Sequence, residues 1–336
     1  MKVSVIVISY NEEKYLSEAI ESVLCQECDF DYEIIIGDDG SNDGSIDVIK
    51  KYAKKYPDKI KYFVMHRNSS LRREDIIPSI RVSNLIKKGL NLAAGEYVNI
   101  LSGDDIFCDK YKLSDSVDLL SNKKNGVAVC AYNNLYSNGE TENSVMRKLP
   151  FVYHWSYEYI HISCFLFRKN IVMNNLLERF CDDVGMIFTL GVYSEDDFVY
   201  TDKVMFSYRQ RENSIMYNSD KVELSIIEIL MLQDIMNDKK FNLIYTSRFF
   251  KPLSYLLKNR CELNKEKYKK YFNSARIYEN DILFKIKEFN KISMCNKFQI
   301  IKFIAISYCS KLIMKRIAKM RYPIIKKYKN GHSCKK

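Results

Sequence analysis

The sequence predicts an α/β fold: a Rossmann-like, mixed but mainly parallel sheet flanked by helices, followed by an α-helical, basic C-terminal region. Short β-branched apolar segments alternate with amphipathic helical patterns over residues 1–132, as in βαβ units. A polar cluster follows each of the first four of these strands. Beyond residue 220 the pattern is helical, rich in Tyr and Lys, and without strand alternation. The 336 residues suffice for one large α/β domain with an appendage.

The first strand is expected at residues 3–9 (VSVIVIS), an uninterrupted β-branched run typical of buried parallel strands. A helix over 12–24 follows, because apolar residues recur along one face at helical spacing. The alternation then continues with strands at 32–37, 60–65, 96–101 and 127–132 and helices at 46–56, 80–94 and 110–120. Gly95 is expected to end helix 80–94 in a left-handed conformation.

The second half of the chain has a more mixed pattern. We expect a strand at 161–168, helices at 169–180 and 184–191, and short strands within 199–208. In open α/β sheets the C-terminal ends of parallel strands share one edge, where ligands bind. The functional residues should therefore lie in the loops that follow the strands.

Charge is distributed unevenly along the chain. The formal net charge is +11, but residues 251–336 hold 23 Lys/Arg and 5 Asp/Glu, a net of +18, while residues 1–250 carry a net of −7. A basic tail of this kind suits an anionic membrane surface or nucleic acid. Nucleic-acid binding is not expected, because the body is acidic and contains no recognised module. The alternative for the basic residues 251–336 is a helix that packs on residues 1–250.

Cysteine spacing and hydropathy indicate a cytoplasmic protein. The ten cysteines are scattered, and Cys25-x-x-Cys28 lacks the second ligand pair of a zinc site, so we expect buried free thiols, with a redox dithiol as the alternative. No secretory signal pattern opens the sequence. The longest apolar stretch, 298–314, is interrupted by Lys302 and Lys311 and is not expected to span a membrane.

Each predicted strand of the first half ends in a polar cluster. The clusters, in chain order, are Ser9-Tyr10-Asn11-Glu12, Asp38-Asp39-Gly40-Ser41, His66-Arg67-Asn68 and Ser102-Gly103-Asp104-Asp105. Helix capping accounts for one carboxylate in a loop but not for two adjacent pairs. The first loop has no G-x-G-x-x-G pattern, which argues against a dinucleotide fold of the usual kind. The EF-hand-like stretch from Asp39 has Lys50 where a bidentate Glu is needed.

These motifs, in this order and spacing, resemble the family 2 glycosyltransferases with the GT-A fold. The resemblance rests on VSVIVISYNEEKYLSEAIESVLCQ, YEIIIGDDGSNDGS and LNLAAGEYVNILSGDD, is strong over residues 3–109 and is traceable to about 217. Members are inverting enzymes that transfer a sugar from a nucleotide diphosphate. The resemblance implies a catalytic domain at 1–217, with a nucleotide-sugar half at 1–109 and an acceptor half at 110–217, before the basic region at 218–336.

The resemblance also implies roles for donor-side residues. Tyr10 lies where the family contacts the nucleobase, and Asp39 matches the aspartate that accepts a hydrogen bond from uracil N3–H. Arg81 could reach a phosphate or Asp39, or it could form a surface salt bridge. The full donor-side set is Ser9, Tyr10, Glu12, Asp39, Asn68, Arg81, Asp104, Arg209 and Arg211. Arg209 and Arg211 belong to YRQREN, which resembles the loop that closes on the diphosphate.

Asp104 and Asp105 match the family's D-x-D region, which implies a divalent cation, Mg²⁺ or Mn²⁺, as cofactor. Hard oxygen ligands and a diphosphate suit such an ion. Ser102 stands where an Asp is common, so we expect few protein ligands, Asp105 for the metal and Asp104 for the metal or ribose. Capping of the next helix is the alternative role for this pair.

Inverting transfer needs a base to take the acceptor hydroxyl proton. The resemblance implies Asp183 for this role, with Asp182 second and the pair Asp196-Asp197 ranked lower; capping of helix 184–191 is the alternative. His161 is expected on the acceptor side or, alternatively, as a structural residue.

The sequence therefore predicts a metal-dependent glycosyltransferase, a hexosyl- or hexosaminyltransferase. The expected donor is a UDP-sugar, and the expected acceptor is a glycan or lipid-linked molecule of cell-surface polysaccharide synthesis, such as capsule or O-antigen. The basic region predicts peripheral attachment to the anionic inner face of the cytoplasmic membrane. The alternatives are an inactive or nucleotidyltransferase-like relative and a non-catalytic adaptor.

Overall fold

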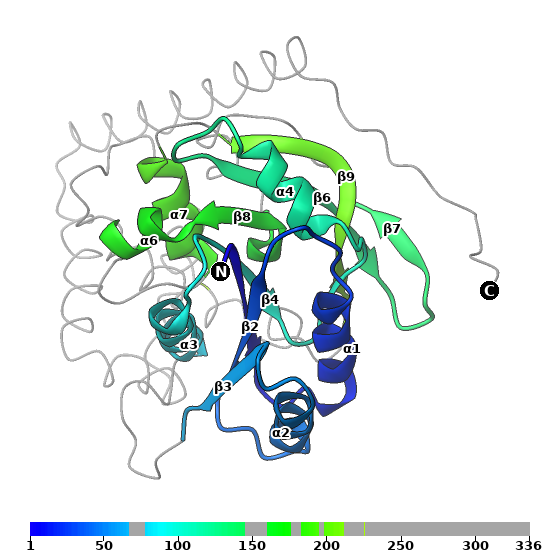
Figure 1. The fold of residues 1–336 in the computed structure, drawn as a ribbon. Helices are drawn as coiled ribbons and strands as arrows, with labels where there is room; N and C mark the ends of the chain where they lie inside the picture. The colour runs from blue at the N-terminus through cyan, green and yellow to red at the C-terminus, as the bar shows by residue number, and fades with distance from the viewer. Residues whose placement is uncertain (67–77, 145–159, 176–182, 195–197, 212–224, 226–336) are drawn as a thin grey trace, which may run out of the picture.

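The computed structural model describes residues 1–66, 78–144, 160–175, 183–194, 198–211 and 225. One sheet organises these residues, with strand order β3-β2-β1-β4-β8-β6-β9-β5 and with β7 paired to β6. Figure 1 shows α3 on one side of strands β1 and β2 and α1 and α2 on the other. The described part of the chain is thus a three-layer α/β arrangement, in agreement with the predicted fold class.

The parallel half of the sheet contains the first strands of the chain. These are β1 (Val3–Ser9), β2 (Tyr32–Asp38), β3 (Ile60–Val64) and β4 (Tyr97–Ser102). The connecting helices are α1 (Glu13–Leu24), α2 (Ser45–Lys55) and α3 (Pro78–Leu92). β1 lies between β2 and β4, and all of these pairings are parallel. The C-terminal ends of β1, β2 and β4 therefore meet at one edge.

The second half of the sheet is mixed, because β8 runs against both of its neighbours while β6 and β9 run in the direction of β4. Its elements are β5 (Ile106–Phe107), α4 (Lys112–Leu119), β6 (Val127–Leu135), β7 (Thr141–Asn143), η2 (Ile162–Cys164), β8 (Phe165–Arg168), α6 (Lys169–Asn175), α7 (Asp183–Tyr193) and β9 (Phe198–Arg209). β8 is antiparallel to β4 and to β6, whereas β9 is parallel to β6. The end of β9 pairs with β5. This last pairing returns Arg209 to the loop that follows β4.

The sequence-based elements agree with the structure in most places. The strand expected at 161–168 is a short 3-10 helix followed by β8, and the short strands expected at 199–208 are one continuous strand. Helix 169–180 is described only as α6, because residues 176–182 lie outside the described part. The small strands β5 and β7 were not predicted.

Gly95 is a correction to the prediction. Its backbone is not among the described residues with positive φ, and α3 ends before it, at Leu92. A Cβ at Gly95 would lie 2.5 Å from the backbone nitrogen of Ser4. Glycine is needed here because the chain passes against β1, not because the turn is left-handed.

The structure describes only Ser225 of the 218–336 region, so the helical and membrane-associating character of that region stays a prediction. Within the described residues, no helix is both long and apolar enough to cross a membrane.

Candidate active site

The loops after β1 and β2 are tied together by hydrogen bonds. Asn11 adopts a positive φ of 55°, and its backbone N–H donates to Ser41 Oγ at 2.9 Å. In return, the Asn42 N–H donates to Asn11 Oδ1 at 2.9 Å. The Glu12 N–H donates to Ser45 Oγ at 2.8 Å. The first two strand-end motifs thus form one rigid platform.

The two aspartates at the end of β2 make different contacts. Asp38 accepts from the N–H and hydroxyl of Ser41, at 2.8 and 2.6 Å, and so shapes the turn. Asp39 instead forms a buried ion pair with Arg81, whose Nε donates to Asp39 Oδ2 at 2.6 Å. Arg81 Nη2 contacts Asp39 Oδ1 and also donates to the Asp39 carbonyl at 3.1 Å. Both side chains are buried, so the surface salt bridge considered for Arg81 is wrong.

Asp104 and Asp105 do not cap the next helix. α4 begins only at Lys112, and its N-cap residue, Tyr111, makes no side-chain capping bond. The loop is held against β1, because the Gly103 N–H donates to the Ile8 carbonyl at 2.8 Å. Both carboxylates are buried. The structure therefore removes the capping alternative.

Only one of the two carboxylate oxygens of Asp105 has a hydrogen-bond partner. Its Oδ1 accepts from the Arg209 N–H at 2.9 Å, whereas its Oδ2 is buried without a hydrogen-bond partner. The Nε2 of His161 lies 3.7 Å from this second oxygen. Because His161 Nδ1 accepts from the Ser163 N–H at 3.3 Å, the neutral ring carries its proton on Nε2, facing Asp105.

The position of His161 was only partly predicted. It packs against Phe206 and Tyr208, with ring centroids 5.0 and 4.8 Å away. The sequence predicted an acceptor-side residue, and the contact with Asp105 was missed because it depends on how β8 and β9 assemble. The one local signal was Ser163, two residues on, which can orient the ring.

Two arginines at the end of β9, Arg209 and Arg211, contact the loop that contains Asp104 and Asp105. Arg209 Nε donates to the Asp104 carbonyl at 2.7 Å, and its Nη2 pairs with Glu18 Oε2. Arg211 Nη2 pairs with Asp104 Oδ2 and lies 3.6 Å from Glu12 Oε1. The predicted donor-side residues Glu12, Asp104, Arg209 and Arg211 are thus brought together.

Glu12 lies deeper than its sequence position suggested. α1 begins at Glu13, and Glu12 makes no side-chain cap bond, because its side chain turns toward the loop after β4. A Cβ at Gly103 would lie 2.3 Å from Glu12 Oε2. That oxygen is buried and has no hydrogen-bond partner.

Burial and mutual repulsion disfavour ionisation of two of these carboxyls. Burial raises the pKa of Glu12 well above its ordinary value, and the Asp104 charge adds to this, whereas Arg211 opposes it. The pKa of Asp105 is likewise raised well above its ordinary value, first by burial and then by the Asp104 charge. A positive charge bound here would favour the ionised forms.

The chemistry of these side chains fits a hard divalent cation. Asp105 Oδ2 and Glu12 Oε2 are buried oxygens without partners, and Mg²⁺ and Mn²⁺ prefer oxygen ligands. Within the described residues, no three His, Cys, Asp or Glu side chains converge in a ready-made metal cluster. Arg211 occupies the space beside Asp104 in this arrangement.

Several predicted residues cannot be compared fully with the structure. Asn68, Asp182 and the pair Asp196-Asp197 lie outside the described residues. Asp183 is the first residue of α7, but its side chain is not described. Among the described residues, Tyr10 is exposed at the platform, and Ser9 Oγ is buried without a hydrogen-bond partner.

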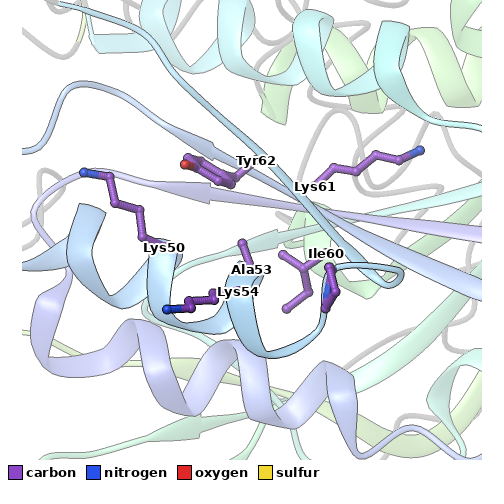
Figure 2. A pocket seen from close by; sticks show the side chains of 7 residues that line it. Lys50, Ala53, Lys54, Ile60, Lys61 and Tyr62 are labelled. Atoms are coloured by element: carbon purple, nitrogen blue, oxygen red, sulfur yellow. The ribbon is translucent and has the colours of Figure 1, made fainter.

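A separate groove of about 510 Å³ lies between α2 and the edge strand β3 (Figure 2). Its lining is Lys50, Ala53, Lys54, Pro57, Ile60, Lys61 and Tyr62. None of the predicted site residues lines this groove, so it is distinct from the cluster of carboxylates and arginines at the strand ends.

Sequence comparison assigns a family to the N-terminal part of the chain. Residues 4–74 match the model of Glycosyl transferase family 2. An uncharacterized protein of Mycobacterium tuberculosis is 35% identical over 117 residues, covering 35% of this chain and 31% of the relative. An uncharacterized glycosyltransferase of Nostoc is 39% identical over 107 residues, covering 32% of this chain and 29% of the relative.

A third relative is the minor teichoic acid biosynthesis protein GgaB of Bacillus subtilis. It is 31% identical over 139 residues, which cover 41% of this chain and 14% of the relative. The chain thus spans less than a third of the length of each of these relatives.

Solved structures share the fold. TarS 1–349 of S. aureus in complex with UDP-GlcNAc has a TM-score of 0.56 at 20% identity, covering 82% of this chain and 79% of that one. The mannosyltransferase PcManGT of Pyrobaculum calidifontis, in complex with GDP-Man and Mn²⁺, has a TM-score of 0.52 at 14% identity, with the same coverage. From the match over residues 4–74, the ordered strand-end motifs and the shared GT-A fold, we conclude that the N-terminal part of this chain is similar to Glycosyl transferase family 2.

Proposed function

We propose that the protein transfers a sugar from a nucleotide diphosphate to a glycan or lipid-linked acceptor, with inversion at the anomeric carbon. The observation that carries the proposal is the strand-end site. An oriented acceptor, Asp39, and a pair of buried aspartates with an unpartnered oxygen lie at the shared edge of β1, β2 and β4. Such an edge is where open α/β sheets bind nucleotides.

Uracil is the base that we propose for the donor nucleotide. An ionised carboxylate only accepts hydrogen bonds, and the uracil N3–H is a donor that matches it. Arg81 fixes the orientation of Asp39, so the acceptor is positioned before the ligand arrives. The related fold of TarS, solved with UDP-GlcNAc, supports this choice, and the GDP-Man complex of PcManGT marks the alternative.

We propose Mg²⁺ or Mn²⁺ as the cofactor, held by Asp105 and Asp104 together with the diphosphate. A bound cation supplies charge neutralisation for the departing nucleoside diphosphate. The Mn²⁺ in the PcManGT complex supports this proposal. Arg209 and Arg211, which lie beside Asp104, are suited to contact phosphate oxygens.

Asp183 stays our proposed base. It would accept the proton of the acceptor hydroxyl while that oxygen forms its bond to the anomeric carbon and the bond to the diphosphate oxygen breaks. The proposal rests on the motif resemblance, and Asp183 is the first residue of α7.

For the acceptor, we propose a cell-surface polysaccharide or its lipid-linked precursor. The teichoic acid protein among the relatives supports this class, and the basic 218–336 region would hold the enzyme at the inner face of the membrane. Capsule and O-antigen are examples of the class.

Isothermal titration with UDP, with and without Mn²⁺, tests the proposal directly. We expect UDP binding to strengthen at least tenfold with Mn²⁺, and a screen of nucleotide sugars to show hydrolysis of a UDP-sugar. Absence of nucleotide binding would contradict the enzyme reading and favour an adaptor. Binding without turnover of any sugar nucleotide would favour an inactive relative. Asp183→Asn should abolish transfer while leaving UDP binding intact, and surviving transfer would exclude Asp183 as base.

A further inference from the structure

Three polar groups in the candidate site lack the partners that burial normally demands. Asp105 Oδ2 and Glu12 Oε2 are unpartnered acceptors, and Arg211 Nε is an unpartnered donor. A buried polar atom without a hydrogen bond lowers the stability of the folded protein. Each of these atoms is therefore a position where a ligand could supply the missing partner. Acceptors and donor lie around the same loop, because Arg211 itself pairs with Asp104 and Glu12.

We propose that Arg211 is a tethered cation that occupies the metal position beside Asp104 in the ligand-free domain, and that it exchanges with the divalent ion when the nucleotide diphosphate binds. This inference rests on the proposed function. The metal then takes the carboxylate oxygens, and the guanidinium moves to the diphosphate. In this exchange Asp104 has a cationic partner both before and after the diphosphate binds.

The charge balance of the site supports the exchange. Glu12, Asp104 and Asp105 are buried close to one another, and like charges in such a place need a cation. Arg211 supplies it through Asp104 Oδ2 and, at 3.6 Å, Glu12 Oε1. The guanidinium carbon of Arg211 also lies 5.7 Å from the ring centroid of Tyr15, so one face of the guanidinium packs against this ring.

The backbone near Arg211 is anchored, so the exchange needs only a side-chain movement. The Gln210 N–H donates to the Leu135 carbonyl at 2.8 Å, and Gln210 Nε2 donates to Asn134 Oδ1 at 2.9 Å. Arg209 is fixed on the other side by its bonds to Asp104 and Asp105. The Arg211 side chain, about a quarter exposed at 28%, can rotate toward solvent and the incoming phosphates.

Exchange makes the metal and the diphosphate bind cooperatively. Without nucleotide, the metal must displace Arg211 from Asp104 and leave the guanidinium without a counter-charge. With diphosphate present, the guanidinium gains phosphate oxygens as new partners. Reciprocity requires that the metal strengthen diphosphate binding by the same factor, typically about 5- to 150-fold for coupled sites.

Removing the arginine should therefore move two affinities in opposite directions. In Arg211→Ala we expect Mn²⁺ alone, followed by electron paramagnetic resonance of free Mn²⁺, to bind about tenfold more tightly than in the wild type. UDP in saturating Mn²⁺ should bind about tenfold more weakly, whereas UMP, which lacks the second phosphate, should change little. In Arg211→Lys, both the Mn²⁺ affinity and the UDP affinity should lie between those of the wild type and those of Arg211→Ala.

Arg168→Gln is the matched control. Arg168 pairs with Glu96 at the opposite end of β4, and its removal should change neither affinity. Unchanged or weaker Mn²⁺ binding in both Arg211 variants, with wild-type circular dichroism, would overturn the exchange. Failure of the wild type itself to bind Mn²⁺ in the presence of UDP would instead contradict the cofactor part of the proposed function.

Discussion

The carboxylate of Asp39 and the guanidinium of Arg81, 42 residues apart in the chain, form a buried ion pair that joins the end of β2 to α3. The arginine contacts both carboxylate oxygens and the backbone carbonyl of the same residue. A pair this enclosed fixes the orientation of Asp39, our proposed nucleobase acceptor, and it also makes the site part of the folded core.

Replacing Arg81 by Met should destabilise the domain strongly. It leaves the Asp39 carboxylate buried without its counter-charge, which costs about 3 kcal/mol or more in other proteins. Urea denaturation followed by circular dichroism measures this cost. Arg168→Met is the control, because the Arg168–Glu96 pair is more exposed and should contribute about 1 kcal/mol or less. Equal losses in the two variants would show that burial of the Asp39 pair is unimportant.

Glu12→Gln should stabilise the cation-free domain increasingly as the pH rises. Because the pKa of Glu12 is raised in the folded state, the folded protein retains a proton that the unfolded chain releases, and wild-type stability falls through that pH interval. The glutamine variant lacks this loss. We expect an advantage of about 1 kcal/mol at pH 8 that shrinks toward pH 5. Glu140→Gln, in an exposed turn, should show no such trend.

Gly103→Ala should destabilise the domain by about 1–3 kcal/mol through overpacking. The new Cβ would meet Glu12 Oε2 at 2.3 Å and Leu16 Cδ1 at 3.0 Å. Shortening Glu12 to Ala in the same protein should recover part of the loss, whereas Glu12→Gln, of equal length, should not. Additive losses in thermal melts of the Gly103/Glu12 double-alanine variant would contradict this steric explanation.

Cys130 and Lys112 form a buried pair, and removing the thiol should lower the free energy of unfolding of the domain. Lys112 Nζ lies 3.4 Å from Cys130 Sγ, and Lys112 is fully buried. A hydrogen bond from Cys164, together with the Lys112 charge, lowers the pKa of Cys130 to about 6. Cys130→Ala leaves the ammonium without a counter-charge, and we expect a loss of about 3 kcal/mol. Lys112→Met in the same protein should restore part of it.

The pH dependence of the Cys130 pair has a definite sign. A thiol whose pKa is depressed in the folded state contributes stability that is complete above the unfolded value near pH 9 and is lost as the pH falls through about 6. Denaturation between pH 9 and 6 should show this slope in the wild type and not in Cys130→Ala. Cys25→Ala, at an exposed thiol, should keep the wild-type slope.

The sequence by itself determined the parallel half of the fold. A β-branched run such as Val3–Ser9 can only be a buried strand in this context, and its polar successor must then emerge at the sheet edge. Local periodicity carries this information because each unit is formed by neighbouring residues. The family resemblance of the ordered motifs then proposed Asp39, Arg81, Asp104 and Asp105 as site residues before any contact was known.

Only the tertiary structure decided how the site is closed. The pairing of β5 with β9 brings Arg209 to Asp105, residues that are 104 positions apart. The contact of Arg211 with Asp104 and the burial of Glu12 follow from the same assembly. No local pattern in the sequence encodes these contacts, because the packing of the whole sheet selects which distant strands pair. Burial in the assembled site then raises the pKa values of Glu12 and Asp105 and leaves some of their oxygens without hydrogen-bond partners.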